Sequence, residues 1–427
     1  MTMQVYQEKI GAINVNLLET DKYKSNRIVF KFRAQLERET LTKRSLLAIL
    51  FETSNKKYPT QTAFRKKLAY LYGADFYTSV EKKGNEHILT VILDLVDGKL
   101  VAEGDKLLEA AFAFLTTVFF EPLVFDYAFD DATLEVEKAN LRSRLESIFD
   151  DKIRYANKRL VEEMSAGDVF AYSALGVLAD IDSITAESLY TYYQQFLADD
   201  IIDVFICGDI SRDKIIPLIE KLPFKKRNER KANLLAFEAR SQSQEINEIQ
   251  PINQGKLVIG YGTNTLFGDD DFVAMQLANG LLGRYPNSKI FINVREKESL
   301  AYYASSGIDS FKGVMLITAG IDEKNYQQAL AIIGEQVTAM KEADFTEEEL
   351  EQTKQMYINE LLETGDNVQG LIELHYNNVL RGKDLTLENW IEQIKQTTKQ
   401  EVVTAINKIK LDTIYFLSKG EAIHEEN

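Results

Sequence analysis

Cysteine is nearly absent from this chain, because Cys207 is the only one among 427 residues. An internal disulfide and a cluster of metal-bound thiolates are therefore both excluded. The apolar neighbours of Cys207 predict a buried thiol. No apolar run approaches the ~20 residues that cross a bilayer, and the first residues lack the basic start and apolar stretch of a signal peptide. We therefore expect a cytoplasmic protein that makes no contact with a membrane.

Positive charge is also in short supply, since 50 Lys and Arg stand against 66 Asp and Glu and leave a net charge of −16. Binding to a phosphate backbone needs clustered cations that displace counterions. We therefore expect no nucleic-acid partner. The one basic cluster lies at residues 225–231 in a polar stretch, and we interpret it as a solvated linker.

Histidine is almost as scarce, with only His87, His375 and His424. No two of them stand four residues apart, so the chain has no helical pair of imidazoles that could hold zinc. We expect a surface or capping role for each histidine. A phosphate-binding loop is missing as well, because Gly280 and Gly283 follow a helical pattern and lack a third glycine.

The chain does contain an internal repeat. The sequence FDDATLEVEK at 129–138 resembles FTEEELEQTK at 345–354, and TAESL at 185–189 parallels TKQEV at 398–402. Two matches in the same order at nearly one spacing favour duplication over chance. Thr185 and Thr398 are predicted helix N-caps, and each helix is followed by an apolar run that predicts a strand.

The fold class that follows is α+β, built from two duplicated domains. We expect an N-terminal domain at 1–225, a linker at 226–252 and a C-terminal domain at 253–427. Apolar residues that recur at intervals of three and four predict helices over 133–164 and 347–380.

One segment, residues 287–307, places several polar and aromatic side chains at a boundary between a helix and a strand. Arg295 is expected to close the helix and Tyr302 to open the strand, so that a guanidinium and a phenol could converge on one carbonyl oxygen or oxyanion. The structural alternative is that Arg295 pairs with Glu296 or Glu298 and that Tyr302 is half-buried in the sheet. Spacing alone favours this alternative.

The same segment closely resembles the C-terminal signature of the insulinase or pitrilysin-type (M16) peptidase family. The resemblance rests on Asn-Ser-x-x-Phe at 287–291 and Arg-Glu-x-x-Ser-Leu-Ala-Tyr at 295–302. In that family an arginine and a tyrosine seven residues later bind the substrate backbone opposite a zinc ion, and the resemblance assigns these roles to Arg295 and Tyr302. Because the duplication and the chain length also resemble the family, it implies two M16-type domains of the LuxS/metallohydrolase-like kind that form half of a clamshell.

The inverted zinc motif of the family, His-x-x-Glu-His, resembles RSLLA at 44–48 but has lost its ligands. Arg44 stands for the first histidine, Leu47 for the glutamate base and Ala48 for the second histidine. No acidic residue occupies the region near Ser143, where the third ligand is expected. The resemblance therefore implies that this chain binds no zinc and is inactive alone.

A non-catalytic, substrate-binding subunit of a heteromeric zinc metallopeptidase is the function that the resemblance implies. The chain is similar to the zinc-less member of paired Gram-positive, M16B-like proteins. A zinc-containing M16 paralogue would be its partner in a heterodimer, and Arg295 with Tyr302 would hold an unfolded peptide. One alternative is a structural or assembly protein with no proteolytic role, and a weaker one is a peptide-binding homodimer.

Overall fold

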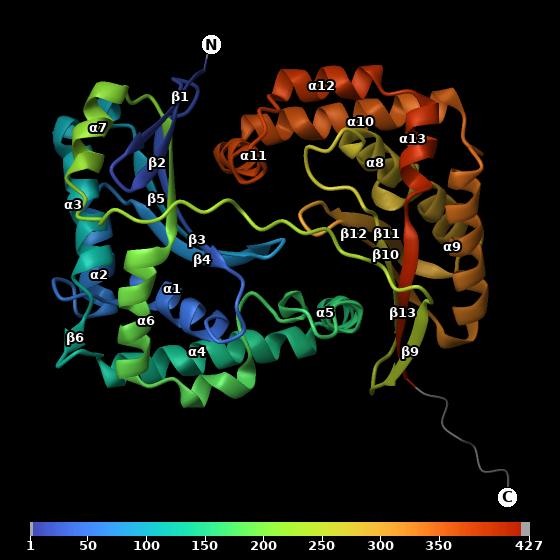
Figure 1. Ribbon diagram of the computed structural model, residues 1–427, viewed down its shortest axis with the longest axis horizontal. Helices are drawn as coiled ribbons and strands as arrows, with labels where there is room; N and C mark the ends of the chain where they lie inside the picture. Colours follow the sequence, from blue (N-terminus) through green and yellow to red (C-terminus); the bar gives the residue numbers. More distant parts are fainter. Residues whose placement is uncertain (1–2, 420–427) are drawn as a thin grey trace, which may run out of the picture. The chain divides into compact units, whose positions relative to one another are not determined.

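The structure is a computed structural model that describes residues 3–419 (Figure 1). Contacts divide the chain into two compact units. The first unit comprises Met1–Ser147 and Tyr172–Asn233, and the second comprises Ile148–Ala171 and Leu234–Asn427. None of the helices between residues 3 and 419 combines the length and the apolar character that crossing a bilayer requires.

The first unit is built on a six-stranded sheet in the order β1-β2-β8-β3-β5-β4. Side chains alternate between the two faces of a strand, so Phe30 and Phe32 of β3 join Leu89 and Val91 of β5 in one core beneath the helices. The strands are β1 (Gln4–Ile10), β2 (Ile13–Glu19), β3 (Ser25–Gln35), β4 (Asp75–Lys83), β5 (Glu86–Val96) and β8 (Ile201–Gly208), with a separate hairpin of β6 (Val124–Phe125) and β7 (Ala128–Phe129). The helices are α1 (Leu41–Thr53), α2 (Gln61–Tyr70), α3 (Leu107–Phe120), α4 (Asp131–Asp150), α6 (Ala186–Asp199) and α7 (Arg212–Glu220).

The second unit has a five-stranded sheet in the order β11-β12-β10-β13-β9. Helix α5 packs on one face of this sheet through Ala156, Leu160 and Met164, and the other face forms a core with the remaining helices. The strands are β9 (Gln244–Ile249), β10 (Gly255–Gly262), β11 (Ala301–Asp309), β12 (Val314–Ile321) and β13 (Lys410–Ser418). The helices are α5 (Lys152–Met164), α8 (Phe272–Asn279), α9 (Tyr326–Lys341), α10 (Glu347–Asp366), α11 (Val368–Arg381), α12 (Leu387–Gln396) and α13 (Lys399–Ile406).

Short helical turns complete the two units. Two segments of the second unit, Gly280–Arg284 and Phe291–Lys297, are π-helical. The 3-10 turns lie at Gly98–Leu100, Gly104–Lys106, Val169–Ala171, Leu178–Ser183 and Glu323–Asn325.

The two sheets share one topology, which confirms the predicted duplication and the α+β class. The order β9-β13-β10-β12-β11 corresponds to β2-β8-β3-β5-β4, and in both series the first pair is parallel and the other pairs are antiparallel. Helices α4 and α10 have the same length and begin at Asp131 and Glu347, whereas α6 and α13 begin at Ala186 and Lys399. The number of residues from the start of α4 to the start of α10 equals the number from 129 to 345 in the first sequence match. The number from the start of α6 to the start of α13 likewise equals the number from 185 to 398 in the second match.

Both threonines that were expected to cap helices do so. The Oγ1 atom of Thr185 accepts a hydrogen bond of 3.1 Å from the backbone N–H of Ser188 at the start of α6. The Oγ1 atom of Thr398 accepts one of 3.3 Å from Glu401 at the start of α13. In each case the third helical residue returns a side-chain acceptor to the threonine N–H, which makes a capping box.

Each of the two long predicted helices is broken once, so the prediction of one continuous helix over each range was wrong. Asp151 separates α4 from α5, and Asn367 separates α10 from α11. The side chain of each accepts hydrogen bonds from two backbone N–H groups that follow it. A side chain that satisfies these free donors starts a new helix at that point, although the apolar periodicity runs on.

The structural units differ from the expected domain ranges in two places. Helix α5 falls inside the expected N-terminal range 1–225 but packs in the second unit, because its apolar face is buried against Val258 and Tyr415. The expected linker 226–252 contains β9, which pairs with β13. The domain boundaries expected from the sequence, 1–225, 226–252 and 253–427, stay predictions.

Cys207 lies on β8 and its side chain is fully buried. Burial raises the pKa of the thiol to about 12. The thiolate, which is the reactive and metal-binding form, is therefore not populated at neutral pH. The predicted buried thiol is confirmed.

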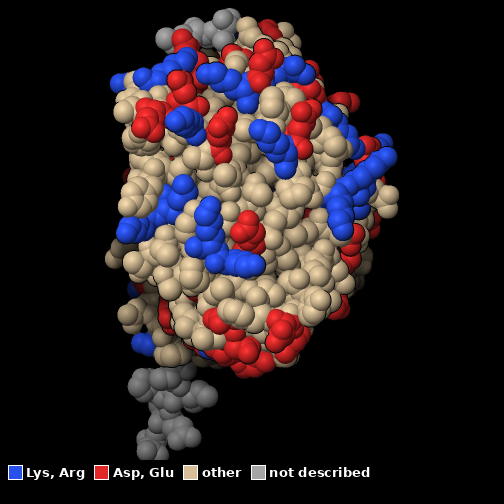
Figure 2. Space-filling model, turned by 90° about the vertical axis from the view of Figure 1, so that its left-hand side faces the viewer, with Lys and Arg blue, Asp and Glu red and all other residues tan. Residues whose placement is uncertain are grey.

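Charged side chains of both signs share the surface shown in Figure 2. Lys and Arg alternate with Asp and Glu over its upper part, uncharged residues dominate its centre and acidic residues gather at its lower end. Basic residues on this face do not form the continuous surface that binding to a phosphate backbone requires. The expected lack of a nucleic-acid partner stays a prediction.

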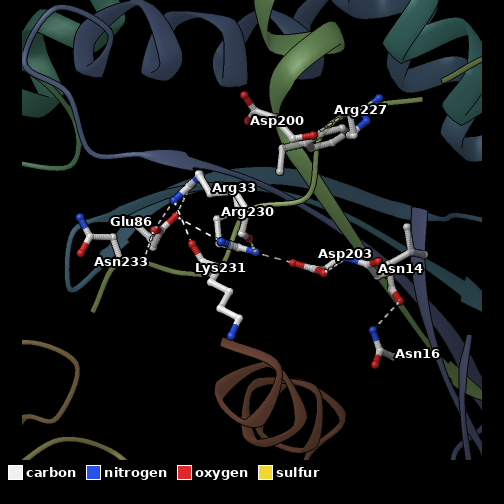
Figure 3. Close-up of polar contacts among 12 residues, drawn as sticks. Asn14, Asn16, Arg33, Glu86, Asp200, Asp203, Arg227, Arg230, Lys231 and Asn233 are labelled. Atoms are coloured by element: carbon white, nitrogen blue, oxygen red, sulfur yellow. Dashed lines mark hydrogen bonds and ion pairs between the residues drawn. The ribbon is translucent and has the colours of Figure 1, made fainter. Parts of the chain in front are cut away.

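The interpretation of residues 225–231 as a solvated linker is wrong for the two arginines of that stretch. Arg230 donates two hydrogen bonds of 2.6 Å to the carboxylate of Glu86, which is fully buried at the start of β5 (Figure 3). Arg33 lies 3.4 Å from the same carboxylate, and Arg227 donates to two carbonyl groups at the end of α6. These contacts hold the stretch against the first sheet.

Glu248 on β9 ties α5 to the second sheet. The hydroxyl groups of Tyr155 and Tyr415 donate hydrogen bonds of 2.6 and 2.7 Å to its carboxylate, and Nε of Arg159 donates one of 3.2 Å. Burial opposes ionisation of Glu248, but the hydrogen bonds more than offset it and lower the pKa of the carboxyl group to about 2. The ionised form therefore stabilises the folded state.

We expect Glu248→Gln to lower the free energy of unfolding by about 2 kcal/mol at neutral pH. A carboxyl whose pKa is lowered by folding contributes stability above its ordinary pKa and loses it as the pH falls to the folded value. The difference from the wild type should therefore shrink between pH 4.5 and about pH 2. Urea titrations at several pH values measure this, with the exposed Glu238→Gln as control. A difference that does not change with pH would contradict the role of the charge.

Candidate functional site

Arg295 and Tyr302 lie on a segment with three departures from regular structure. Arg295 belongs to the π-helical stretch Phe291–Lys297. Ser299 has a positive φ of 53°, which is rare for a residue with a side chain. The pairing of β11 with β12 shifts register at Tyr302. π-helical turns and β-bulges are both enriched at functional sites, where they redirect side chains.

The side chain of Arg295 is available to a ligand. It is 42% exposed, and its Nε atom lies 3.8 Å from Oε1 of Glu296, which is too long for a hydrogen bond. Its guanidinium carbon lies 4.6 Å from the centre of the Phe291 ring. Between residues 3 and 419 no side chain or carbonyl accepts a hydrogen bond from it. The structural alternative, in which Arg295 pairs with Glu296 or Glu298, is met only by a loose ion pair with Glu296 that contains no hydrogen bond.

Tyr302 is the second residue of β11, and it is 82% exposed. The alternative that it packs half-buried in the sheet is wrong, because the bulge turns its side chain away from the core. No hydrogen bond or ring contact joins Tyr302 to Arg295 within the described chain. The structure thus places the two on consecutive elements with both polar groups exposed, and their shared role in binding stays a prediction.

Arg44 lies on α1 and is fully buried. Its Nη1 atom donates a hydrogen bond of 3.1 Å to the hydroxyl group of Tyr192, and its Nη2 atom donates to Asp200 and to the carbonyl of Phe32. Burial alone would lower the pKa of this guanidinium, but the Asp200 carboxylate more than offsets it and raises the pKa. A permanent cation whose two terminal nitrogens are hydrogen-bonded therefore occupies this place in the core, although its Nε atom has no partner there.

The other positions of the degenerate motif are part of the core or of the surface. Leu47 and Ala48 are buried among the apolar residues of the first unit, whereas Ser143 and Arg144 are exposed on α4. No group of three His, Cys, Asp or Glu side chains that could hold a metal is present in the described part of the chain. A guanidinium and two aliphatic side chains offer no lone pair to a metal ion, so these residues do not fit zinc.

His87 is fully buried, so the expectation of a surface or capping role is wrong for it. Its Nε2 atom lies 3.0 Å from the carbonyl oxygen of Ala174. Burial lowers the pKa of the imidazole well below its ordinary value, and the charge of Arg44 lowers it further. The ring is therefore neutral at physiological pH. His375 is half-buried on α11, and His424 lies outside the described residues.

Two features of these sites were missed at the level of sequence. Asp200 and Tyr192 complete the shell around Arg44, and no local pattern relates them to a residue so far back along the chain. The contact of Phe291 with Arg295 was open to prediction, because residues four apart in a helix are neighbours.

Comparison with known proteins identifies the family. The model for the "Peptidase M16 inactive domain" matches residues 183–357. The chain is 37% identical over 418 residues to the probable inactive metalloprotease YmfF of Bacillus subtilis (strain 168), a match that covers 97% of this chain and 98% of that protein.

Two crystal structures are similar over nearly the whole chain. A conserved protein from Enterococcus faecalis V583 is 36% identical, with a TM-score of 0.92 and coverage of 97% of this chain and 99% of that one. A peptidase M16 inactive domain from Pseudomonas fluorescens shares the fold, with a TM-score of 0.79 at 17% identity, and covers 98% of this chain and 99% of that one. The chain therefore belongs to the M16 peptidase family, as an inactive metalloprotease homologue.

Proposed function

We propose that this chain is the non-catalytic, substrate-binding subunit of a heteromeric M16-type peptidase that acts on peptides. The observation that carries the proposal is the contrast between two arginines. Arg44 is buried and hydrogen-bonded to three groups of the core, whereas Arg295 is exposed, forms only a loose ion pair with Glu296 and makes no hydrogen bond within the described chain. A structural role accounts for Arg44 but leaves Arg295 and Tyr302 unexplained.

The chemistry available at Arg295 and Tyr302 suits a peptide carbonyl group. A guanidinium offers several N–H donors in one plane, and a phenol offers an O–H donor. Together they can orient a carbonyl oxygen and stabilise negative charge that develops on it. In this proposal the zinc ion belongs to an M16 paralogue, which is the partner in a cytoplasmic heterodimer, and this chain contributes substrate binding.

Peptide hydrolysis with zinc present tests the proposal directly. The assay compares this protein alone, a paralogue with an intact His-x-x-Glu-His motif alone, and an equimolar mixture of the two. Activity confined to the mixture supports a shared site. Silence in all three samples, together with stable assembly of the pair, would overturn the proposal in favour of a structural or assembly role.

Arg295→Ala should reduce turnover by the mixture about 100-fold, because loss of one donor to a developing oxyanion has an effect of this order. Tyr302→Phe, which removes only the hydroxyl group, should reduce it about 10-fold. Steady-state kinetics measures both, and gel filtration shows whether the pair still assembles. Arg65→Ala, which removes an exposed arginine from α2, is the matched control. Wild-type turnover in the Arg295→Ala mixture would refute the assignment.

A further inference from the structure

The π-helical turn that carries Arg295 is held open by a side chain. The Nδ2 atom of Asn293 donates a hydrogen bond of 2.9 Å to the carbonyl of Lys289 and one of 2.7 Å to Oε1 of Gln336 on α9. In an α-helix the Lys289 carbonyl would accept from the backbone N–H of residue 293. A side-chain amide that takes this acceptor favours the wider turn, since insertion into the helical ladder is a known cause of such distortions.

Asn293 is itself fixed from two sides. Its Oδ1 atom accepts a hydrogen bond of 3.0 Å from Nζ of Lys297, so the amide has partners at both of its ends. The contact with Gln336 anchors the turn to a 16-residue helix. The turn is therefore tied by hydrogen bonds to α9, although Arg295 itself is exposed.

Phe291 supports the guanidinium of Arg295. The distance of 4.6 Å from the guanidinium carbon to the ring centre lies within the range of a cation–π contact. A guanidinium stacked on a ring keeps its N–H edges free for a carbonyl or carboxylate. Two acidic residues, Glu296 and Glu298, follow within three positions. The ring thus supports the cation alongside its loose ion pair with Glu296, which lies 3.8 Å from Nε.

We infer that Phe291 and Asn293 are positioning residues for Arg295. Asn293 keeps the turn in its π-helical form and anchors it to α9, and the Phe291 ring, four positions before Arg295, supports the guanidinium from within that turn. The ring then presents the guanidinium to a peptide before the peptide binds, which lowers the entropic penalty of ordering a long side chain. The expected effect of Phe291 and Asn293 on turnover rests on the proposed function of Arg295. Their expected effect on the Arg295 side chain in the free protein does not.

A double-mutant cycle tests the inference in the mixture with the zinc-containing paralogue. The probe is a quenched fluorescent peptide of unstructured sequence. Phe291→Leu should lower turnover roughly two- to fivefold, the effect of a cation–π contact at an exposed site. The same substitution should have no effect in the Arg295→Ala background, and Phe291→Tyr should retain wild-type turnover. Equal losses in both backgrounds would show that Phe291 is structural and would overturn the inference.

A measurement on the chain without partner or peptide separates this inference from the proposed function. The NMR signal of the Arg295 side-chain Nε–H group should be shifted upfield by the ring current of Phe291. The shift should vanish in Phe291→Leu, become smaller in Asn293→Ala, in which the turn loses its hydrogen bond to α9, and remain in Phe291→Tyr. A signal at the position of a free arginine in the wild type would overturn the inference, whatever the assay shows. A shifted signal with an inactive wild-type mixture would refute the proposed function alone.

Discussion

Asp200→Ala is expected to lower the free energy of unfolding by about 3–5 kcal/mol, the range for a buried ion pair that loses one partner. Arg44 is fully buried and Asp200 is the carboxylate that its Nη2 atom contacts. Without that carboxylate the core retains a cation that cannot lose its proton. Urea denaturation followed by circular dichroism measures the change.

Asp199→Ala provides the control, because Asp199 is the exposed neighbour of Asp200 at the end of α6. Its replacement should change the stability by less than about 0.5 kcal/mol. If Asp200→Ala also lay within this range, Arg44 would have another way to be neutralised and the ion pair would not hold this part of the core together. A second arm replaces Arg44 by methionine in the Asp200→Ala background, which should recover part of the loss.

Glu86→Ala should be similarly destabilising, by about 3–5 kcal/mol, because it leaves Arg230 without its carboxylate and Arg33 with only the longer ion pair to Asp203. Arg230 forms one hydrogen bond to each carboxylate oxygen of Glu86, and Arg33 lies close to the Oε2 atom of the same carboxylate (Figure 3). The backbone N–H of Asn233 also donates to Glu86. Loss of these contacts should release the stretch that ends at Asn233 from the first sheet.

Limited digestion with trypsin reports that release. Cleavage after Arg230 or Lys231 should become many times faster in Glu86→Ala under conditions where the rest of the chain resists the protease. Glu229→Ala is the control, because Glu229 is an exposed acid in the same stretch that pairs with Lys9. Equal cleavage rates in Glu86→Ala and the wild type would mean that the stretch is held by other contacts.

The duplication was accessible from sequence because local signals repeat at a fixed distance. Thr185 and Thr398 are each followed by an acceptor that completes a capping box, and such boxes depend on neighbours three residues away. The strands that follow them were also predicted correctly. Elements that depend on nearby residues can be found in this way, even without any knowledge of the three-dimensional pairing.

The parts that escaped prediction depend on residues far apart in the chain. Arg44 was expected only as a substitution in a degenerate motif, but its place in the core is set by Asp200 and Tyr192. The π-helical turn at Arg295 depends on Gln336 of another helix. The breaks at Asp151 and Asn367 were missed for a different reason, because the apolar periodicity on either side of each break is continuous.

The discontinuous composition of the second unit bears on how the chain folds during synthesis. Helix α5 ends at Met164, but its sheet is incomplete until β13, which lies between β10 and β9, has been made. About 250 residues separate the two, and at ~5–20 residues per second the ribosome needs roughly 13–50 s to add them. Until β10 is made the apolar side of α5 has no strand to cover, and until β13 is made it covers an incomplete sheet. A nascent chain stalled before β13 would therefore carry a finished first unit and a partly covered helix, whose exposed apolar surface is of the kind that chaperones bind.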